Sequence, residues 1–272
     1  MTEPEVLGRQ AEKSDWLDHA VRVGLVAYGV VHLLIGWLAV QLALGEGSGK
    51  ASAQGALQEL ARKPFGQTMV WAVAVGMFLL VLWRLLEAAF GHRDEEGSTR
   101  TRKRVTSGLK AAIYGALGVT AVRVAIGSGG SGGSGKGSRG LTAKVMDLPA
   151  GQWLVVAVGL AIIGYAGNTA WRGWKEKFAE HLETEGKLGW SGAGYLILGK
   201  VGYIAKGIAL AIVGVLFCSA GITHRADKSG GLDQALQKVL QQPFGPYLLI
   251  AIGLGIGCYG LFCFARARHL DR

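Results

Sequence analysis

The sequence has few residues of the kinds that build most soluble sites. Charged residues make up 18% of its 272 residues, and it contains only 5 prolines and 3 cysteines. Three cysteines without metal-ligand spacing exclude a disulfide framework and indicate no zinc motif. The chain also lacks a nucleotide-binding glycine loop and the Ser/His/Asp or Cys/His arrangements of nucleophilic catalysis. We therefore predict no catalytic residues, no cofactor and no metal, and we do not expect an enzyme.

Acidic residues are scarce as well, since 19 Asp and Glu face 29 Lys and Arg, for a formal charge of +10. A basic chain can bind nucleic acid, but these cations cluster between long apolar runs and do not form one basic face, so we expect no nucleic-acid partner. The first residues are partly acidic, with Glu3, Glu5 and Glu12. They do not form the basic segment and short apolar core of a cleaved signal peptide.

Apolar residues are abundant, at 50%, and they form long runs. A helix needs roughly 20 apolar residues to cross the hydrocarbon core of a bilayer. Residues 148–171 and 239–265 contain no charged residue or histidine, and only His32 interrupts residues 23–45. Residues 111–122 are too short to be assigned alone, but the repeat described next supports them. We predict transmembrane helices near residues 23–45, 68–90, 106–126, 150–171, 201–223 and 245–265.

These runs belong to a unit that occurs three times. The first helix of the unit contains Tyr28-Gly29, which recurs as Tyr114-Gly115 and, with lysine replacing tyrosine, as Lys206-Gly207. The second helix follows Pro-Phe-Gly at residues 64–66 and 243–245, and Pro-Ala-Gly at residues 149–151. Self-similarity of this kind indicates a repeat architecture. The domains we predict are an N-terminal segment of residues 1–21 and repeats at residues 22–93, 104–177 and 199–272.

This pattern resembles a bacterial family of membrane proteins described as domain of unknown function 1206, in which a pair of transmembrane helices occurs three times. The resemblance covers about residues 20–270. It implies an all-α integral membrane fold of six transmembrane helices in three hairpins, and it supplies no catalytic or binding residues. Because each unit has an even number of helices, the repeats are parallel and not inverted.

Lysine and arginine predict the orientation, since cytoplasmic loops are enriched in them. They are most frequent in the N-terminal segment, in the loops after the second and fourth helices, and in the tail. We therefore expect a multipass protein of the bacterial plasma membrane with both termini in the cytoplasm. On the outer side, amphipathic stretches near residues 53–61 and 232–240 are expected to lie in the interface plane, as structural elbows or alternatively as a lid. The Gly/Ser run at residues 127–140 is a linker.

Polar side chains inside the predicted spans are the candidate functional residues, because such groups are costly to place in lipid. His32 lies near the middle of the first helix, one turn after Tyr28. The alternative to a functional role is a structural one, in which the His32 ring forms a hydrogen bond between helices. Lys206 can reach the cytoplasmic surface or face a polar cavity. If the hairpins surround an axis, Tyr28, His32 and Lys206 approach the same interior region.

Further residues carry weaker predictions. Asn168 either forms a hydrogen bond between helices or joins the intramembrane polar site. Arg84 and Glu87 are three residues apart at the cytoplasmic end of the second helix and predict an interfacial ion pair. Glycines repeat at positions that predict close helix packing. They are Gly29 and Gly36, Gly108 and Gly115, Gly207 and Gly214, and Gly253 and Gly257.

Two functions remain open from the sequence. If the protein is a small transporter or channel-like protein, His32, Lys206 and Asn168 are expected to surround a hydrated interior. The alternative is a structural or scaffolding protein that binds lipids, a partner membrane protein or further copies of itself, and it predicts that these side chains are satisfied within packed helices. Membrane lipids are the expected partner in both cases.

Overall fold

The computed structural model describes residues 15–46, 51–90, 97–127, 140, 142–178 and 189–269, and this part of the chain is helical without any strand. Within it, six helices are long and apolar enough to cross a membrane. The predicted all-α fold of three repeated helical hairpins is therefore confirmed. The long helices are α2 (Asp15–Ala43), α4 (Gly66–Phe90), α5 (Gly97–Ala125), α7 (Gly151–Trp174), α8 (Gly189–Ile222) and α10 (Gly245–Arg268).

The first helix of each unit begins earlier than the apolar run predicts. The starts predicted near residues 23, 106 and 201 lie at Asp15, Gly97 and Gly189. Hydropathy marks the part of a helix that suits lipid, whereas the backbone continues through polar residues that contain no proline. With 34 residues, α8 is about 50 Å long at the usual helical rise, well beyond the roughly 30 Å hydrocarbon core.

Short helices precede the second long helix in the outer units. They are α3 (Ala53–Ala61) and α9 (Leu232–Leu240), and a 3-10 turn, η4 (Ala226–Lys228), comes before α9. Ser52 caps α3 by accepting a hydrogen bond from the Gly55 N–H at 3.2 Å. Both helices bury one apolar face, with Leu57 on α3 and Leu236 on α9 almost inaccessible. In the middle unit residues 142–146 are helical at the corresponding place.

The Pro-x-Gly motif forms the same turn in all three units. Its middle residue, Phe65, Ala150 or Phe244, has a φ of 59°, in the left-handed region. The following glycine donates its N–H to the carbonyl three residues earlier in each unit, at 2.8 to 2.9 Å. A Cβ on Gly66 would lie 1.9 Å from the carbonyl oxygen of Leu60. The glycine is therefore required by close backbone approach, which explains why it is present in every unit.

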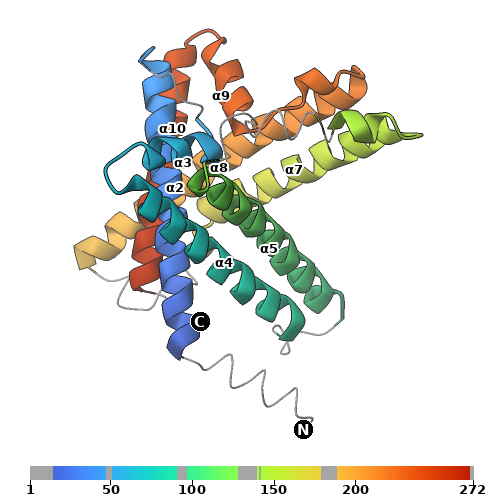
Figure 1. Cartoon of the computed structure of the whole chain (residues 1–272). Helices are drawn as coiled ribbons and strands as arrows, with labels where there is room; N and C mark the ends of the chain where they lie inside the picture. Colours follow the sequence, from blue (N-terminus) through green and yellow to red (C-terminus); the bar gives the residue numbers. More distant parts are fainter. Residues whose placement is uncertain are drawn as a thin grey trace.

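The helices pack most extensively between units and not within them. The closest pairs are α4 with α5, α7 with α8, and α10 with α2, whereas α8 with α10 and α2 with α4 share smaller contacts. Figure 1 shows α2 and α10 side by side, with α4/α5 and α7/α8 as two diverging arms. The two helices of the middle unit, α5 and α7, are not among the well-packed pairs. The order of contact is thus an open arc from α5 through α4, α2, α10 and α8 to α7.

Glycines bring the helices of two pairs into close contact, as predicted. A Cβ at Gly36 on α2 would lie 2.5 Å from the carbonyl oxygen of Gly253 on α10, and one at Gly29 would lie 2.8 Å from that of Gly260. In the other pair, a Cβ at Gly214 on α8 would lie 2.9 Å from a carbonyl oxygen of α7.

The same prediction is wrong for the middle unit. On α10 the Gly257 backbone lies close to Gly36, as predicted, but a Cβ on Gly257 itself would point into open space. A Cβ at Gly108 or Gly257 would meet nothing within 4 Å, and one at Gly115 would meet only Val81, at 3.9 Å. On α5 it is Gly118 that contacts the neighbouring helix, where a Cβ would lie 3.2 Å from the Phe78 ring. Glycine spacing identifies a small-residue face, but it does not tell which direction the packed neighbour occupies.

Candidate functional site

Equivalent residues of the three units meet at the centre of the protein. Tyr28 on α2, Tyr114 on α5 and Lys206 on α8 hold the same position in their units. The Lys206 ammonium donates a hydrogen bond to the Tyr28 hydroxyl at 2.8 Å. The Tyr28 and Tyr114 rings pack edge to face, with centroids 5.2 Å apart. The threefold repeat thus places one side chain from each unit at a common point.

His32 lies directly beside this point. Its Nδ1 is 2.9 Å from the Tyr28 carbonyl oxygen, one helical turn earlier. Because a carbonyl oxygen only accepts, Nδ1 carries the hydrogen and Nε2 is the acceptor in the neutral ring. The His32 ring also lies 4.2 Å from the Tyr28 ring and 5.0 Å from the Tyr259 ring. These contacts hold the imidazole in one orientation among aromatic side chains.

Aromatic rings surround the Lys206 ammonium. It lies 4.0 Å from the centroid of the Tyr259 ring and 4.9 Å from that of Tyr28. Such contacts stabilise a cation by about 2 kcal/mol or more when it is desolvated. We call Tyr28, His32, Tyr114, Lys206 and Tyr259 the central cluster. It joins α2, α5, α8 and α10.

Tyr259 was missed by the sequence analysis, although a signal for it was available. Counted from the Pro-x-Gly motif, Tyr259 of the third unit corresponds to Tyr165 of the second and Leu80 of the first. A tyrosine at the same depth in two units could have been noticed as the repeat was aligned. Tyr203, one turn before Lys206 on α8, extends the cluster with a ring 5.2 Å from that of Tyr259.

The structure does not bring Asn168 into the central cluster. Asn168 is exposed on α7, and the buried polar residue next to it, Thr169, bonds to the Tyr165 carbonyl of its own helix at 2.8 Å. The sequence could not distinguish these outcomes because residues 148–171 are apolar all round and identify no packed face. Asn168 therefore stands apart from Tyr28, His32 and Lys206.

Arg84 and Glu87 form an ion pair on α4. Arg84 is 5% exposed, and its guanidinium lies 3.9 Å from the centroid of the Trp83 ring. Glu87 also accepts a hydrogen bond from the Ser107 hydroxyl of α5 at 3.1 Å. The pair therefore connects α4 to α5 at the end where the loop joins them.

Among the described residues, no group of three or more His, Cys, Asp or Glu side chains is placed to hold a metal ion. The central cluster offers one cation, hydroxyl groups, an imidazole and ring faces. These groups can stabilise a positive charge and form hydrogen bonds between helices.

Comparison with known proteins agrees with the repeat. The chain is 30% identical over 255 residues to "Uncharacterized protein YxxB" of Bacillus subtilis (strain 168), which covers 92% of this chain and 90% of that protein. No solved structure matches the chain. The family described as Domain of Unknown Function (DUF1206) matches at residues 23–91, 106–176 and 201–269. One match falls on each hairpin, as the sequence resemblance predicted, and the chain belongs to this family.

Proposed function

We propose that the protein is a multipass protein of the bacterial plasma membrane, with both termini in the cytoplasm, and that it acts without catalysis as a structural or scaffolding protein for lipids or other membrane proteins. Six helices with the length and apolarity of membrane spans support the membrane location, and the relative in Bacillus subtilis supports a bacterial one. The distribution of lysine and arginine supports the orientation.

The observation that carries the scaffold proposal is the contact between Lys206 and Tyr28. A lysine within a membrane span needs a partner or water, because an unpaired ammonium in lipid is costly. Here a hydroxyl at 2.8 Å and two ring faces stabilise it, and the groups come from the first and third units. His32 is also satisfied, but by a hydrogen bond within α2, while its ring packs against Tyr259 of α10. The polar interior thus serves to hold the units together.

A small transporter or channel-like protein is the second candidate. The observation that favours transport is that Lys206, at the point where the three units meet, is only partly buried. A partly exposed ammonium at this place could bind an anion or take part in proton movement.

Flux measurements separate the two functions. Wild type, His32→Leu and Lys206→Met are reconstituted in liposomes, and pH-dependent ion flux is followed together with folded yield. The scaffold proposal predicts that the flux of wild type equals that of protein-free liposomes. It also predicts that Lys206→Met loses thermal stability in detergent, while Lys175→Met, at an exposed lysine near the end of α7, does not. Wild-type flux that His32→Leu abolishes without loss of folded protein would establish the transport function instead.

A further inference from the structure

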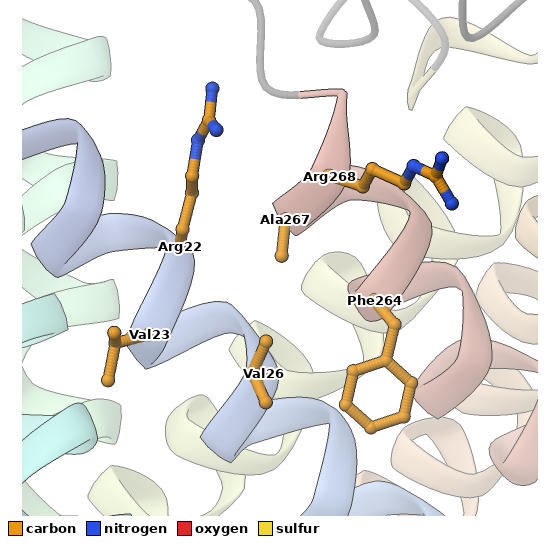
Figure 2. A pocket seen from close by; sticks show the side chains of 6 residues that line it. All are labelled: Arg22, Val23, Val26, Phe264, Ala267 and Arg268. Carbon is orange, nitrogen blue, oxygen red and sulfur yellow. The ribbon is translucent and has the colours of Figure 1, made fainter.

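A cleft lies between α2 and α10, near the start of α2 and the end of α10. Its volume is about 390 Å³, and it is lined by Arg22, Val23, Val26, Phe264, Ala267 and Arg268. Figure 2 shows Val26 and Phe264 on either side of the gap between the two helices, with Ala267 and the two arginines toward one end. The cleft is therefore cationic at that end and apolar along its walls.

The apolar wall is open to the surroundings of the protein. Val23 and Val26 are 51% and 42% exposed, although both belong to a helix with the properties of a membrane span. Within the described part of the chain, neither Arg22 nor Arg268 has a hydrogen bond or ion pair through its side chain. The cleft thus combines two arginines that form no ion pair with a described residue and a surface that suits a hydrocarbon chain.

The corresponding places at the other two helix pairs carry different side chains and contacts. In the α7/α8 pair, Lys200 stands where α2 has Arg22, and its ammonium binds Glu176 at 3.0 Å and lies 5.7 Å from the Trp174 ring. Trp174 in turn stands where α10 has Arg268. The α7/α8 pair therefore supplies both the anion and the apolar cover from its own side chains.

The α4/α5 pair differs from the α2/α10 pair in another way. Ala89 stands where α10 has Arg268, and its carbonyl oxygen accepts a hydrogen bond from Arg104 at 2.9 Å. Gly108 stands where α2 has Arg22, so this pair carries neither of the two cations. Of the three equivalent pairs, the α2/α10 pair is thus the one that has an arginine at both places, beside a cleft with apolar walls.

We propose that this cleft binds an anionic phospholipid of the cytoplasmic leaflet, with the headgroup phosphate between Arg22 and Arg268 and an acyl chain along Val23, Val26 and Phe264. Arginine binds phosphate through paired N–H groups, and basic pockets between spanning helices are known to hold such headgroups. The lipid would supply the counter-charge and the apolar cover that Glu176 and Trp174 supply in the α7/α8 pair. The proposal rests on the proposed membrane location and names one lipid class that the scaffold binds.

The full chain in neutral detergent is mixed with phosphatidylglycerol or phosphatidylcholine, and the shift of the unfolding temperature and the lipid retained in native mass spectrometry are measured. Phosphatidylglycerol is expected to stabilise wild type more than phosphatidylcholine does. The double variant Arg22→Gln/Arg268→Gln should bind phosphatidylglycerol about thirtyfold more weakly. The matched control Lys175→Gln/Lys177→Gln removes the same charge from exposed residues and should behave as wild type. Glycerol phosphate without acyl chains should give no stabilisation.

Several outcomes would overturn the proposal. Equal weakening in the arginine and lysine double variants would mean a general attraction of charge, and an equal response to the two lipids would mean that no anionic site exists. A response to glycerol phosphate alone would assign a soluble anion. Loss of stability on neutralising Glu3, Glu5 and Glu12, without a response to phosphatidylglycerol, would assign the arginines to the N-terminal segment. The flux experiment does not depend on these variants, so the two proposals fail separately.

Discussion

The crossing of α2 and α10 offers a matched pair of alanine substitutions. A Cβ at Gly36 would lie 2.5 Å from the Gly253 carbonyl oxygen and 2.9 Å from the Gly257 nitrogen, whereas a Cβ at Gly257 would meet nothing within 4 Å. Both changes add one methyl group to a helix, and both gain helix propensity of up to about 1 kcal/mol. Their difference therefore isolates the cost of the contact between the two backbones.

The expected cost follows from the distances. Carbon and oxygen normally pack at about 3.5 Å, so Gly36→Ala forces the helices apart by about 1 Å at this point. A gap of that size removes a quarter to a half of the dispersion energy of each adjoining contact, and helices in a membrane rely on that energy for association. We expect Gly36→Ala to be less stable than Gly257→Ala by about 2 kcal/mol, in the usual range for overpacking.

The assay is thermal unfolding of both variants and wild type in the same detergent. A difference of about 2 kcal/mol corresponds to roughly 4–8 °C in a protein of this size. Gly257→Ala should unfold at or above the wild-type temperature. Equal unfolding temperatures for the two variants would show that α2 and α10 do not cross at Gly36, and the arrangement around the central cluster would then be wrong as well.

Three further predictions concern the turns, the packing and the orientation. Gly66→Ala should lower the unfolding temperature because its Cβ would meet a backbone carbonyl at 1.9 Å, while Phe65→Gly should not, since it relieves a positive φ. Gly207→Leu should also destabilise the protein, because even a Cβ there lies 2.9 Å from the α7 backbone. In intact cells without the native cysteines, an impermeant thiol reagent should label a cysteine at position Ser131 and not one at Thr101. Labelling of the second alone would mean that the orientation is inverted.

Hydropathy and self-similarity were sufficient for the helices and the repeat. An apolar run long enough to cross a bilayer has few other stable forms, and the recurring Pro-x-Gly turn fixed the unit boundaries closely enough to find α5, whose own run is short. The sequence also indicated that Tyr28 and Lys206, as equivalent residues, would approach each other. In the structure the Lys206 ammonium lies 2.8 Å from the Tyr28 hydroxyl.

The neighbours of each helix could not be predicted in the same way. Lipid is as apolar as leucine, so a spanning helix carries little periodic signal for its packed face. For this reason Asn168 was grouped with His32. For the same reason a side chain at Gly257 was expected to point at a neighbouring helix. The positive φ of Phe65 could not be predicted from the sequence either, because residues in the left-handed region are usually glycine and rarely phenylalanine.

The pairing of helices between units gives the α2/α10 pair a distinct position in the protein. The loop after α4 joins it to α5, and the loop after α7 joins it to α8, so these pairs form between neighbours along the chain. No such loop joins α10 to α2, which lie at opposite ends of the sequence but side by side in Figure 1. Closing this pair costs more chain entropy than closing the others. Its close glycine contacts act against this entropy cost, and a bound lipid would add stability at the point where the side chains leave a cleft.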